Sequence, residues 1–235
     1  MAASAQLEVL NARMVACERC SRLRAYCAEV ARVKRRAYLD QEYWGRPVPS
    51  FGDPKARVWI VGLAPGAHGS NRTGRPFTGD GSGEFLYPVL YDTGFASQPK
   101  AVSRGDGMKL TALWISSVVR CAPPGNKPTP GEQRNCASCL DEETALLRNL
   151  RVVVCLGKIA FDGFLAQQLR VGNIPARSKF QFRHGAEYAL PGEITLLASY
   201  HPSLQNTNTG KLTRVMFLDI FRRARVLAGL DELNR

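Results

Sequence analysis

Three polar side chains follow separate apolar runs of the sequence and are the first candidates for chemistry. Asp80 closes a glycine-rich segment, Asn126 lies in a proline-rich segment, and His201 comes just after the last apolar run. A carboxylate can orient or deprotonate water, and an imidazole can donate a hydrogen bond to a departing anion. An amide offers both a donor and an acceptor, which suits it to the edge of a nucleobase.

Each of these residues also has an ordinary structural interpretation. Asp80 precedes an expected helix, where an aspartate commonly caps the first turn. Asn126 follows a glycine, as is typical of turns, and a single histidine is most often structural. The sequence leaves the two interpretations of Asp80 balanced. For His201, its place at the end of an expected strand favours a functional role.

The glycine-rich segment from residue 62 to residue 80 has the composition of a loop that approaches a ligand closely. Glycines let the backbone come near a ligand and donate its N–H groups, although a tight connection from strand to helix would also use them. The spacing is wrong for a dinucleotide-binding loop. A P-loop is also absent from the sequence, because Leu212 follows Gly210-Lys211 and Gln205 stands where the first glycine should be. Nucleotide hydrolysis is therefore not indicated.

Two apolar residues stand out in loops that are otherwise polar or rich in glycine. Phe77, beside Pro76, is placed either to join the core or to stack on a base. Leu204 follows Ser203 in the last of these loops, and a lone leucine there has the shape to wedge into a stack of bases. Both loops therefore offer groups suited to a nucleobase.

Four short, almost continuous apolar runs must position these loops. They are rich in β-branched residues and do not alternate, as expected for parallel strands buried on both faces. Their ranges are Val58 to Gly62, Leu113 to Val119, Val152 to Leu156 and Ile194 to Ser199. Helical patterns fall between and after them, at Glu84 to Thr93, from a Thr129-x-x-Glu132 capping box onward, at Lys158 to Leu169 and at Thr213 to Leu230. This alternation predicts an α/β sandwich with a mainly parallel sheet, which binds ligands beyond the carboxyl ends of its strands.

Length and charge bound the class of protein. A chain of 235 residues that is 45% hydrophobic is expected to form one domain over residues 1–235. Its 32 Lys and Arg against 20 Asp and Glu give a net charge of +12, which favours a polyanionic partner over the alternative of a generally basic surface. No apolar run reaches the roughly 18 residues of a membrane helix, and no signal region opens the chain. We therefore expect a cytoplasmic protein without membrane association.

Seven cysteines are many for a reducing compartment, and an odd number argues against a complete set of disulfides. Metal ligation is therefore expected, and four thiolates suit either zinc or an iron–sulfur cluster. A zinc site would use the pairs Cys17/Cys20 and Cys136/Cys139 and leave Cys121 spare. A cluster would use Cys17, Cys20, Cys121 and Cys136. The residues alone do not choose between these alternatives.

Taken together, the loops resemble those of the family 5 uracil-DNA glycosylases and, more weakly, those of family 4. The resemblance spans nearly the whole chain, from the C-x-x-C that begins at Cys17 through GLAPGAHGSNRTGRPFTGD at 62–80 and RCAPPGN at 120–126 to HPSLQNTNTG at 201–210. It implies a three-layer α/β/α fold around a central four-stranded, mainly parallel sheet. It also implies a structural [4Fe-4S] cluster, with ligands Cys17, Cys20, Cys121 and Cys136.

The resemblance implies a role for each matching residue. The superfamily commonly places Asp or Asn after the first strand to activate water, whereas this sequence has Ala64 there, as family 5 does. Asp80 matches the acid that closes the first motif and is expected to direct the water. Asn126 matches the base-reading residue, His201 the leaving-group histidine, and Asn206 another catalytic asparagine that holds the sugar-phosphate or positions water. Contacts to substrate are expected from Gly62, Ala64, Phe77, Asn126, Ser203 and Leu204.

The activity implied is that of a monofunctional DNA glycosylase in base excision repair. It would act as a monomer on DNA, flip the damaged nucleotide out, and remove uracil and also other deaminated bases such as hypoxanthine. Flipping costs a few kcal/mol and is cheapest at mispaired bases.

Two other classes of function remain to be tested. A non-enzymatic, metal-stapled nucleic-acid binder explains the charge and the cysteines, but leaves Asp80, Asn126 and His201 without a purpose. A cluster-bearing nuclease would need several carboxylates for divalent ions, and the expected site offers Asp80 alone.

Overall fold

Four parallel strands form the centre of the sheet in the computed structural model, which describes residues 3–230. They lie in the order β3-β2-β4-β6, with bounds β2 Val58–Gly62, β3 Leu113–Ser117, β4 Val152–Leu156 and β6 Ile194–Ser199. Every residue of β2, β3 and β4 is buried, as expected for parallel strands covered on both faces. The four predicted strands are confirmed, and β3 ends two residues early. The outermost residues of the expected single domain, 1–2 and 231–235, lie outside the described range.

The sheet has six strands, so the expectation of four is wrong at its two edges. β1 (Phe51–Gly52) pairs antiparallel with β3, and β5 (Glu187–Leu190) pairs antiparallel with β6. Neither contains an apolar run, because β1 has two residues and only Leu190 of β5 is buried. Strands this short or this exposed have no recognisable pattern of apolar residues in the sequence. They pair only because β3 and β6 offer free edges beside them.

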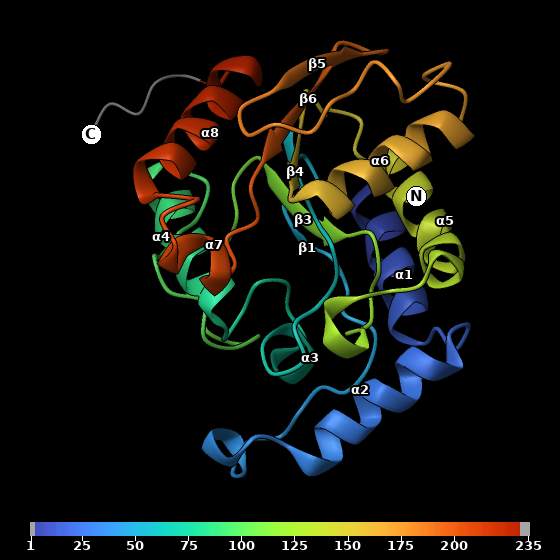
Figure 1. Ribbon diagram of the computed structural model, residues 1–235, viewed down its shortest axis with the longest axis vertical. Helices are drawn as coiled ribbons and strands as arrows, with labels where there is room; N and C mark the ends of the chain where they lie inside the picture. The colour runs from blue at the N-terminus through green and yellow to red at the C-terminus, as the bar shows by residue number, and fades with distance from the viewer. Residues whose placement is uncertain (1–2, 231–235) are drawn as a thin grey trace.

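Helices cover both faces of the sheet and confirm the expected three-layer α/β/α arrangement (Figure 1). One face is covered by α1, α5 and α6, and the other by α4 and α8. Their bounds are α1 Ala3–Val15, α4 Gly81–Asp92, α5 Pro130–Leu146, α6 Lys158–Arg170 and α8 Arg214–Leu227. A separate apolar core fills the space on each side of the sheet.

Shorter elements and one further helix lie around the loops that follow the parallel strands. α2 and α3 lie toward the bottom of Figure 1, and α7 lies beside the start of α4. The bounds are α2 Ser21–Val33, α3 Ser70–Thr73 and α7 Leu204–Asn208, with 3-10 turns at Arg36–Tyr38 and Pro124–Asn126. These elements surround the edge of the sheet at which ligands of α/β proteins bind.

The helices begin where side chains cap them. The predicted capping box is confirmed, since Thr129 Oγ1 accepts from the Glu132 N–H at 3.2 Å and Glu132 Oε2 accepts from the Thr129 N–H at 2.7 Å. α4 begins at Gly81, earlier than the predicted Glu84, because Asp80 caps it. α8 ends at Leu227, three residues before the predicted end.

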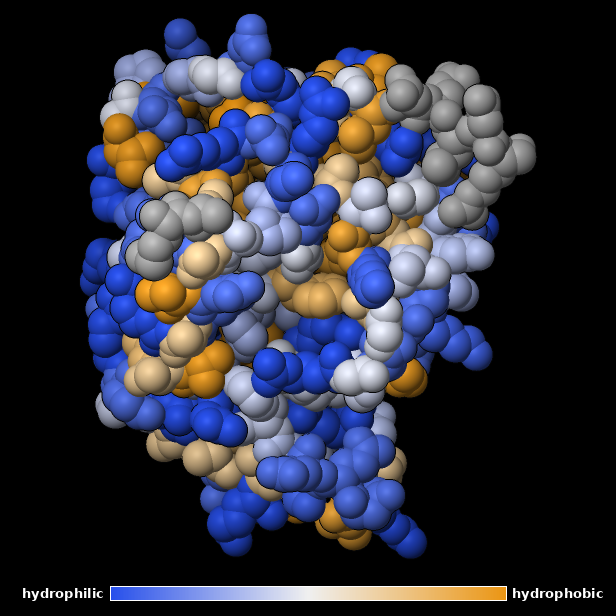
Figure 2. Space-filling view, turned by 180° about the vertical axis from the view of Figure 1, so that it is seen from behind, coloured by the Kyte–Doolittle hydropathy of each residue, from blue (hydrophilic) through white to orange (hydrophobic). Residues whose placement is uncertain are grey.

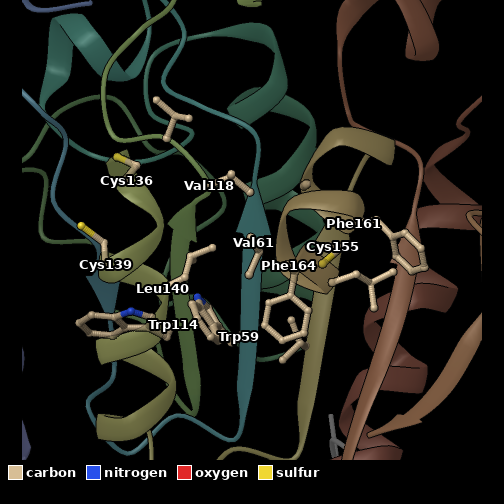
Figure 3. Close-up of a cluster of buried hydrophobic side chains, with 14 of the residues drawn as sticks. Trp59, Val61, Trp114, Val118, Cys136, Cys139, Leu140, Cys155, Phe161 and Phe164 are labelled. Atoms are coloured by element: carbon tan, nitrogen blue, oxygen red, sulfur yellow. The ribbon is translucent and has the colours of Figure 1, made fainter. Parts of the chain in front are cut away.

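Aromatic side chains build the core between α5, α6 and the sheet (Figure 3). Trp59 meets Phe164 edge-on, with ring centroids 5.8 Å apart and planes at 88°. The indole nitrogens are satisfied inside the core, because Trp59 Nε1 donates to Ser116 Oγ at 2.8 Å and Trp114 Nε1 donates to Glu143 Oε1 at 3.0 Å. The sheet that carries the loops is therefore held by a packed and hydrogen-bonded core.

The surface is mainly hydrophilic on the face seen from behind, with apolar residues in small groups (Figure 2). Across residues 3–230, no helix combines the length and the apolar character needed to span a membrane.

Candidate active site

A cavity of about 780 Å³ opens at the carboxyl ends of β2, β3 and β6. Its lining includes Asp80, Asn126 and His201, which come from three separate loops. Parallel strands bring their carboxyl ends to one edge of the sheet, so loops far apart in sequence meet there. The three candidate side chains therefore share one cavity, which is the geometric condition for a common chemistry.

Asp80 both caps a helix and lines the cavity. Its Oδ1 accepts from the Gly83 N–H at 3.0 Å, at the start of α4. The carboxylate lies over two glycines, since a Cβ at Gly69 would stand 1.9 Å from Asp80 Oδ2 and one at Gly66 2.9 Å away. Burial raises the pKa of this carboxyl, against the opposing effect of hydrogen bonds from the Gly83 and Ser82 backbone. The two interpretations of Asp80 are thus compatible.

His201 is a neutral imidazole at physiological pH, because burial lowers its pKa to about 4. Its ring centroid lies 6.1 Å from that of Phe77, with the two planes tilted by 36°. The backbone of His201 is held by Asn206, whose Nδ2 donates to the His201 carbonyl at 2.8 Å. Asn206 is not among the residues that line the cavity, so the structure places it behind the histidine.

Phe77 forms part of the cavity wall in a conformation that most side chains avoid. Its φ is +50°, and the ring is almost fully buried. Gly62 lies against this ring, where a Cβ would stand 2.9 Å from Phe77 Cζ. Gly62 therefore makes room for Phe77 and is not itself part of the cavity lining, whereas Ala64 is.

The rim of the cavity carries the remaining expected contact residues. Asn126 is exposed and adopts a left-handed φ of +58°, and within residues 3–230 its side-chain amide makes no hydrogen bond. Ser203 caps α7 by accepting from the Asn206 N–H at 3.4 Å. Leu204 is 58% exposed and touches Gly81 at the start of α4. An exposed amide and an exposed leucine thus stand at the mouth of the cavity.

Two buried arginines that the sequence analysis passed over hold the glycine-rich segment in shape. Arg72 donates to the backbone carbonyls of His68 and Gly79, each at 2.7 Å. Arg75 forms a bidentate ion pair with Asp106, with distances of 2.7 and 2.6 Å. Their position within a glycine-rich loop could have identified them from the sequence. The backbone carbonyls of such a loop are not paired in a helix or sheet and need hydrogen-bond donors.

His68 also lines the cavity and was missed as a site residue. It stands on the wall with Arg35 and Tyr38, which precede β1 in the chain. The signal in the sequence was its position in a glycine-rich loop, as one of three histidines. Its contact to Tyr43 depends on the tertiary structure and was not predictable from spacing.

Five of the seven cysteines line a second cavity. Its lining includes Cys17, Cys20, Cys121, Cys136 and Cys139, and all of the cysteines are free. Figure 3 shows Cys136 and Cys139 on the same side of α5. The lining contains every cysteine of both sets considered from the sequence. Among residues 3–230, no three His, Cys, Asp or Glu side chains are grouped closely enough to hold a metal ion.

Polar groups around the second cavity point at sulfur atoms. The Arg120 backbone N–H donates to Cys136 Sγ at 3.4 Å, and Arg19 Nε donates to Cys17 Sγ at 3.4 Å. Asn135 Nδ2 lies 3.5 Å from Cys20 Sγ. Such donors stabilise thiolates, so the residues present fit a thiolate-bound group.

Arg120 lies in the wall between the two cavities and lines both of them. Its guanidinium is buried, pairs with Glu143 and donates to Ser50 Oγ at 2.7 Å. Breaking a buried pair of this kind costs about 3–5 kcal/mol, because one charge is left without a partner. The paired Arg120 side chain is therefore a shared part of the walls of the cysteine cavity and the large cavity.

The sequence of this chain is similar to those of known DNA glycosylases. The profile of the uracil DNA glycosylase superfamily matches residues 49–225. A protein named Type-5 uracil-DNA glycosylase from Thermus thermophilus is 53% identical over 218 residues, covering 92% of this chain and 96% of that protein. Proteins of the same name from Mycobacterium bovis and Pyrobaculum aerophilum are 46% and 45% identical, covering 94% and 92% of this chain and 82% and 91% of their own lengths.

Proposed function

This chain belongs to the uracil DNA glycosylase superfamily, and we propose that it removes uracil from DNA by hydrolysing the N-glycosidic bond. The relatives named Type-5 uracil-DNA glycosylase support this over almost the full chain. The observation that carries the proposal is the meeting of Asp80, Asn126 and His201 in one cavity. The net charge of +12 is consistent with a DNA substrate.

The reaction separates charge, and the cavity has a group for each end. As the glycosidic bond breaks, the bonding electrons leave with the base and positive charge develops on the sugar. Neutral His201 donates a hydrogen bond to the pyrimidine O2, where negative charge accumulates. Asp80 orients the water whose oxygen bonds to the sugar carbon, and it takes the proton that this water loses.

Asp80 is the better of the two carboxylates in the cavity for this task. Glu84 also lines the cavity, but it is exposed, whereas burial raises the pKa of Asp80. Ala64 stands where the superfamily commonly has a water-activating residue and cannot act on water. Asn206 supports the site from behind by holding the His201 carbonyl.

The rim residues recognise the extruded base. Phe77 stacks on the ring, while the unpaired amide of Asn126 reads its edge. Leu204, which is 58% exposed, enters the space that the base leaves, and Ser203 contacts the strand. A cavity of about 780 Å³ is larger than a pyrimidine needs, so we extend the proposal to hypoxanthine.

Abasic-site formation on DNA that contains uracil or hypoxanthine tests the proposed function. The protein is incubated with labelled duplex and single strands, which are then cleaved by alkali at abasic sites and separated on a gel. We expect alkali-dependent cleavage at the damaged base and release of the free base. Binding without abasic sites would favour the non-enzymatic alternative. Strand cleavage without alkali that chelators abolish would favour a nuclease.

We also propose that Cys17, Cys20, Cys121 and Cys136 hold a structural [4Fe-4S] cluster. All four line one cavity, and polar donors point at three of their sulfurs. When bound, such a cluster would tie the N-terminal segment to α5 and to the loop that carries Asn126. Its role is to hold these segments together, and it takes no part in breaking the bond.

Replacing Cys17 by serine is expected to remove visible absorbance, iron and acid-labile sulfide together. The melting temperature should fall by about 10 °C, because losing a structural metal site removes several kcal/mol. Cys121→Ser and Cys139→Ser form a matched pair that separates the two metal alternatives. The cluster requires loss of iron with Cys121→Ser and retention with Cys139→Ser. The reverse pattern, with zinc in the wild type, would overturn it.

We further propose that residues 1–235 form one domain and that the protein acts as a monomer in the cytoplasm. Within residues 3–230 no two cysteines form a disulfide, which is consistent with a reducing compartment. Sedimentation at micromolar concentration, with and without DNA, tests the oligomeric state.

A further inference from the structure

One wall of the large cavity has no part in the chemistry described above. It consists of Arg35, Tyr38 and His68, which come from the segment after α2 and from the loop after β2. Arg72 ties these two segments together, because its guanidinium lies 3.9 Å from the centre of the Tyr38 ring and its Nε donates to the His68 carbonyl at 2.7 Å. The Arg72 contacts therefore hold the two segments of this wall against each other.

A buried tyrosine determines which nitrogen of His68 carries the proton. The Tyr43 hydroxyl accepts from the Arg35 backbone N–H at 3.3 Å and lies 3.0 Å from His68 Nδ1. Since Tyr43 is buried, its own hydrogen needs an acceptor, and His68 Nδ1 is the one in reach. The neutral imidazole then carries its proton on Nε2, on the far side of the ring from Tyr43.

His68 lines the cavity and stays neutral while its Nε2 carries the proton. Burial lowers its pKa, and the positive charges of Arg35 and Arg72 lower it further. Arg35 itself is exposed, and within residues 3–230 it forms no ion pair with a carboxylate. The wall thus presents one permanent positive charge and one neutral donor side by side, which together suit a singly charged oxyanion.

We propose that Arg35 and His68 bind one phosphodiester group of the DNA strand beside the extruded nucleotide. This rests on the proposed function, because a flipped nucleotide brings its flanking phosphates to the mouth of the same cavity. His68 donates its Nε2–H to a non-bridging oxygen, and Arg35 supplies the opposite charge. Tyr43 is a positioning residue that keeps the histidine proton on Nε2.

The first test measures binding, so it does not depend on excision. The probe is a fluorescent duplex with 2′-fluoro-2′-deoxyuridine, whose glycosidic bond resists cleavage, and its dissociation constant is measured by anisotropy over a range of salt. His68→Ala should weaken binding about tenfold, since hydrogen bonds to charged groups are worth at least that, without changing the slope against salt. Arg35→Ala should weaken binding and lower that slope by about one.

The second test locates the phosphate. Methylphosphonates, which lack the negative charge, replace single phosphates next to the flipped position. A methylphosphonate at one of these positions should weaken binding by the wild type about tenfold. The same methylphosphonate should change binding by His68→Ala less than about threefold, because that variant has already lost the contact. Tyr43→Phe should show an intermediate loss, and Arg36→Ala, an exposed neighbour outside the cavity lining, should lose less than about twofold.

Specific outcomes would overturn this inference. Methylphosphonates that affect wild type and His68→Ala equally at every position would show that His68 touches no phosphate. A His68→Ala protein that binds normally but excises uracil slowly would place the histidine in the chemistry. If the wild type forms abasic sites while His68→Ala and Arg35→Ala bind DNA normally, this inference is refuted. The proposed function would still stand in that case.

Discussion

Replacing His201 by alanine is expected to slow uracil excision by about 10²- to 10³-fold while DNA affinity changes less than about threefold. The imidazole is buried at the end of β6 and is neutral, because burial lowers its pKa to about 4. A neutral donor gains most when the base becomes negative, so its contribution appears in the transition state more than in the bound substrate. Single-turnover rates at saturating protein measure the effect directly.

A matched histidine provides the control for this variant. His184 lies outside the cavity lining, stacks on Tyr200 with centroids 5.0 Å apart, and accepts from the Tyr200 N–H. We expect His184→Ala to excise uracil within about threefold of the wild-type rate. Equal losses of rate and affinity in His201→Ala would contradict a role in stabilising the leaving group.

The neutrality of His201 also has a consequence for stability. Its folded pKa of about 4 lies below the ordinary value of 6.5, so between these limits the unfolded chain binds a proton that the folded protein does not. This group therefore lowers the free energy of unfolding as the pH falls from about 6.5 toward 4. The His201→Ala protein should lose less stability than wild type over that window, as measured by urea unfolding.

Asp80→Asn is expected to slow excision by about 10²- to 10³-fold and leave the fold unchanged. Asparagine caps helices about as well as aspartate, so the bond from the Gly83 N–H to the side-chain oxygen can persist. What changes is the atom over Gly66 and Gly69, which becomes a donor and can no longer accept a proton from water. The melting temperature should therefore stay within about 2 °C of wild type while the single-turnover rate falls.

The pH dependence of the rate identifies the same carboxylate. Burial raises the pKa of Asp80, and the group must be ionised to act as a base, so the wild-type rate should fall as the pH drops through that raised pKa. Asp80→Asn should lose this acidic limb. Glu84→Gln, which alters the exposed carboxylate of the cavity, should retain it. If the acidic limb of the pH–rate profile disappears with Glu84→Gln, then Glu84 rather than Asp80 orients the water.

A substitution at Gly69 tests the position of the carboxylate by steric means. A Cβ there would stand 1.9 Å from Asp80 Oδ2 and 2.7 Å from Asp80 Cβ, so the Asp80 side chain has to move. Gly69→Ala should therefore displace the carboxylate and slow excision to a similar degree as Asp80→Asn. Wild-type activity in both variants would show that neither the residue nor its position matters for the water.

The patterns that predicted the strands and helices are local ones. Four apolar runs identified the buried strands because a strand covered on both faces must be apolar throughout. Thr129 and Glu132 predicted a helix start because a cap satisfies backbone groups within one turn. The edge strands β1 and β5 escaped prediction, since they bury too little to leave a pattern and depend on their neighbours for pairing.

The sequence by itself determined that Asp80, Asn126 and His201 would meet, because parallel strands bring their carboxyl ends to one edge. Only the tertiary structure decided that Gly62 lies beneath Phe77, that Asn206 holds the His201 backbone, and that Tyr43 orients His68 across 25 residues of chain. Strand direction follows from a burial pattern that local sequence records. A contact between distant side chains depends on how whole elements pack, and no spacing along the chain records that packing.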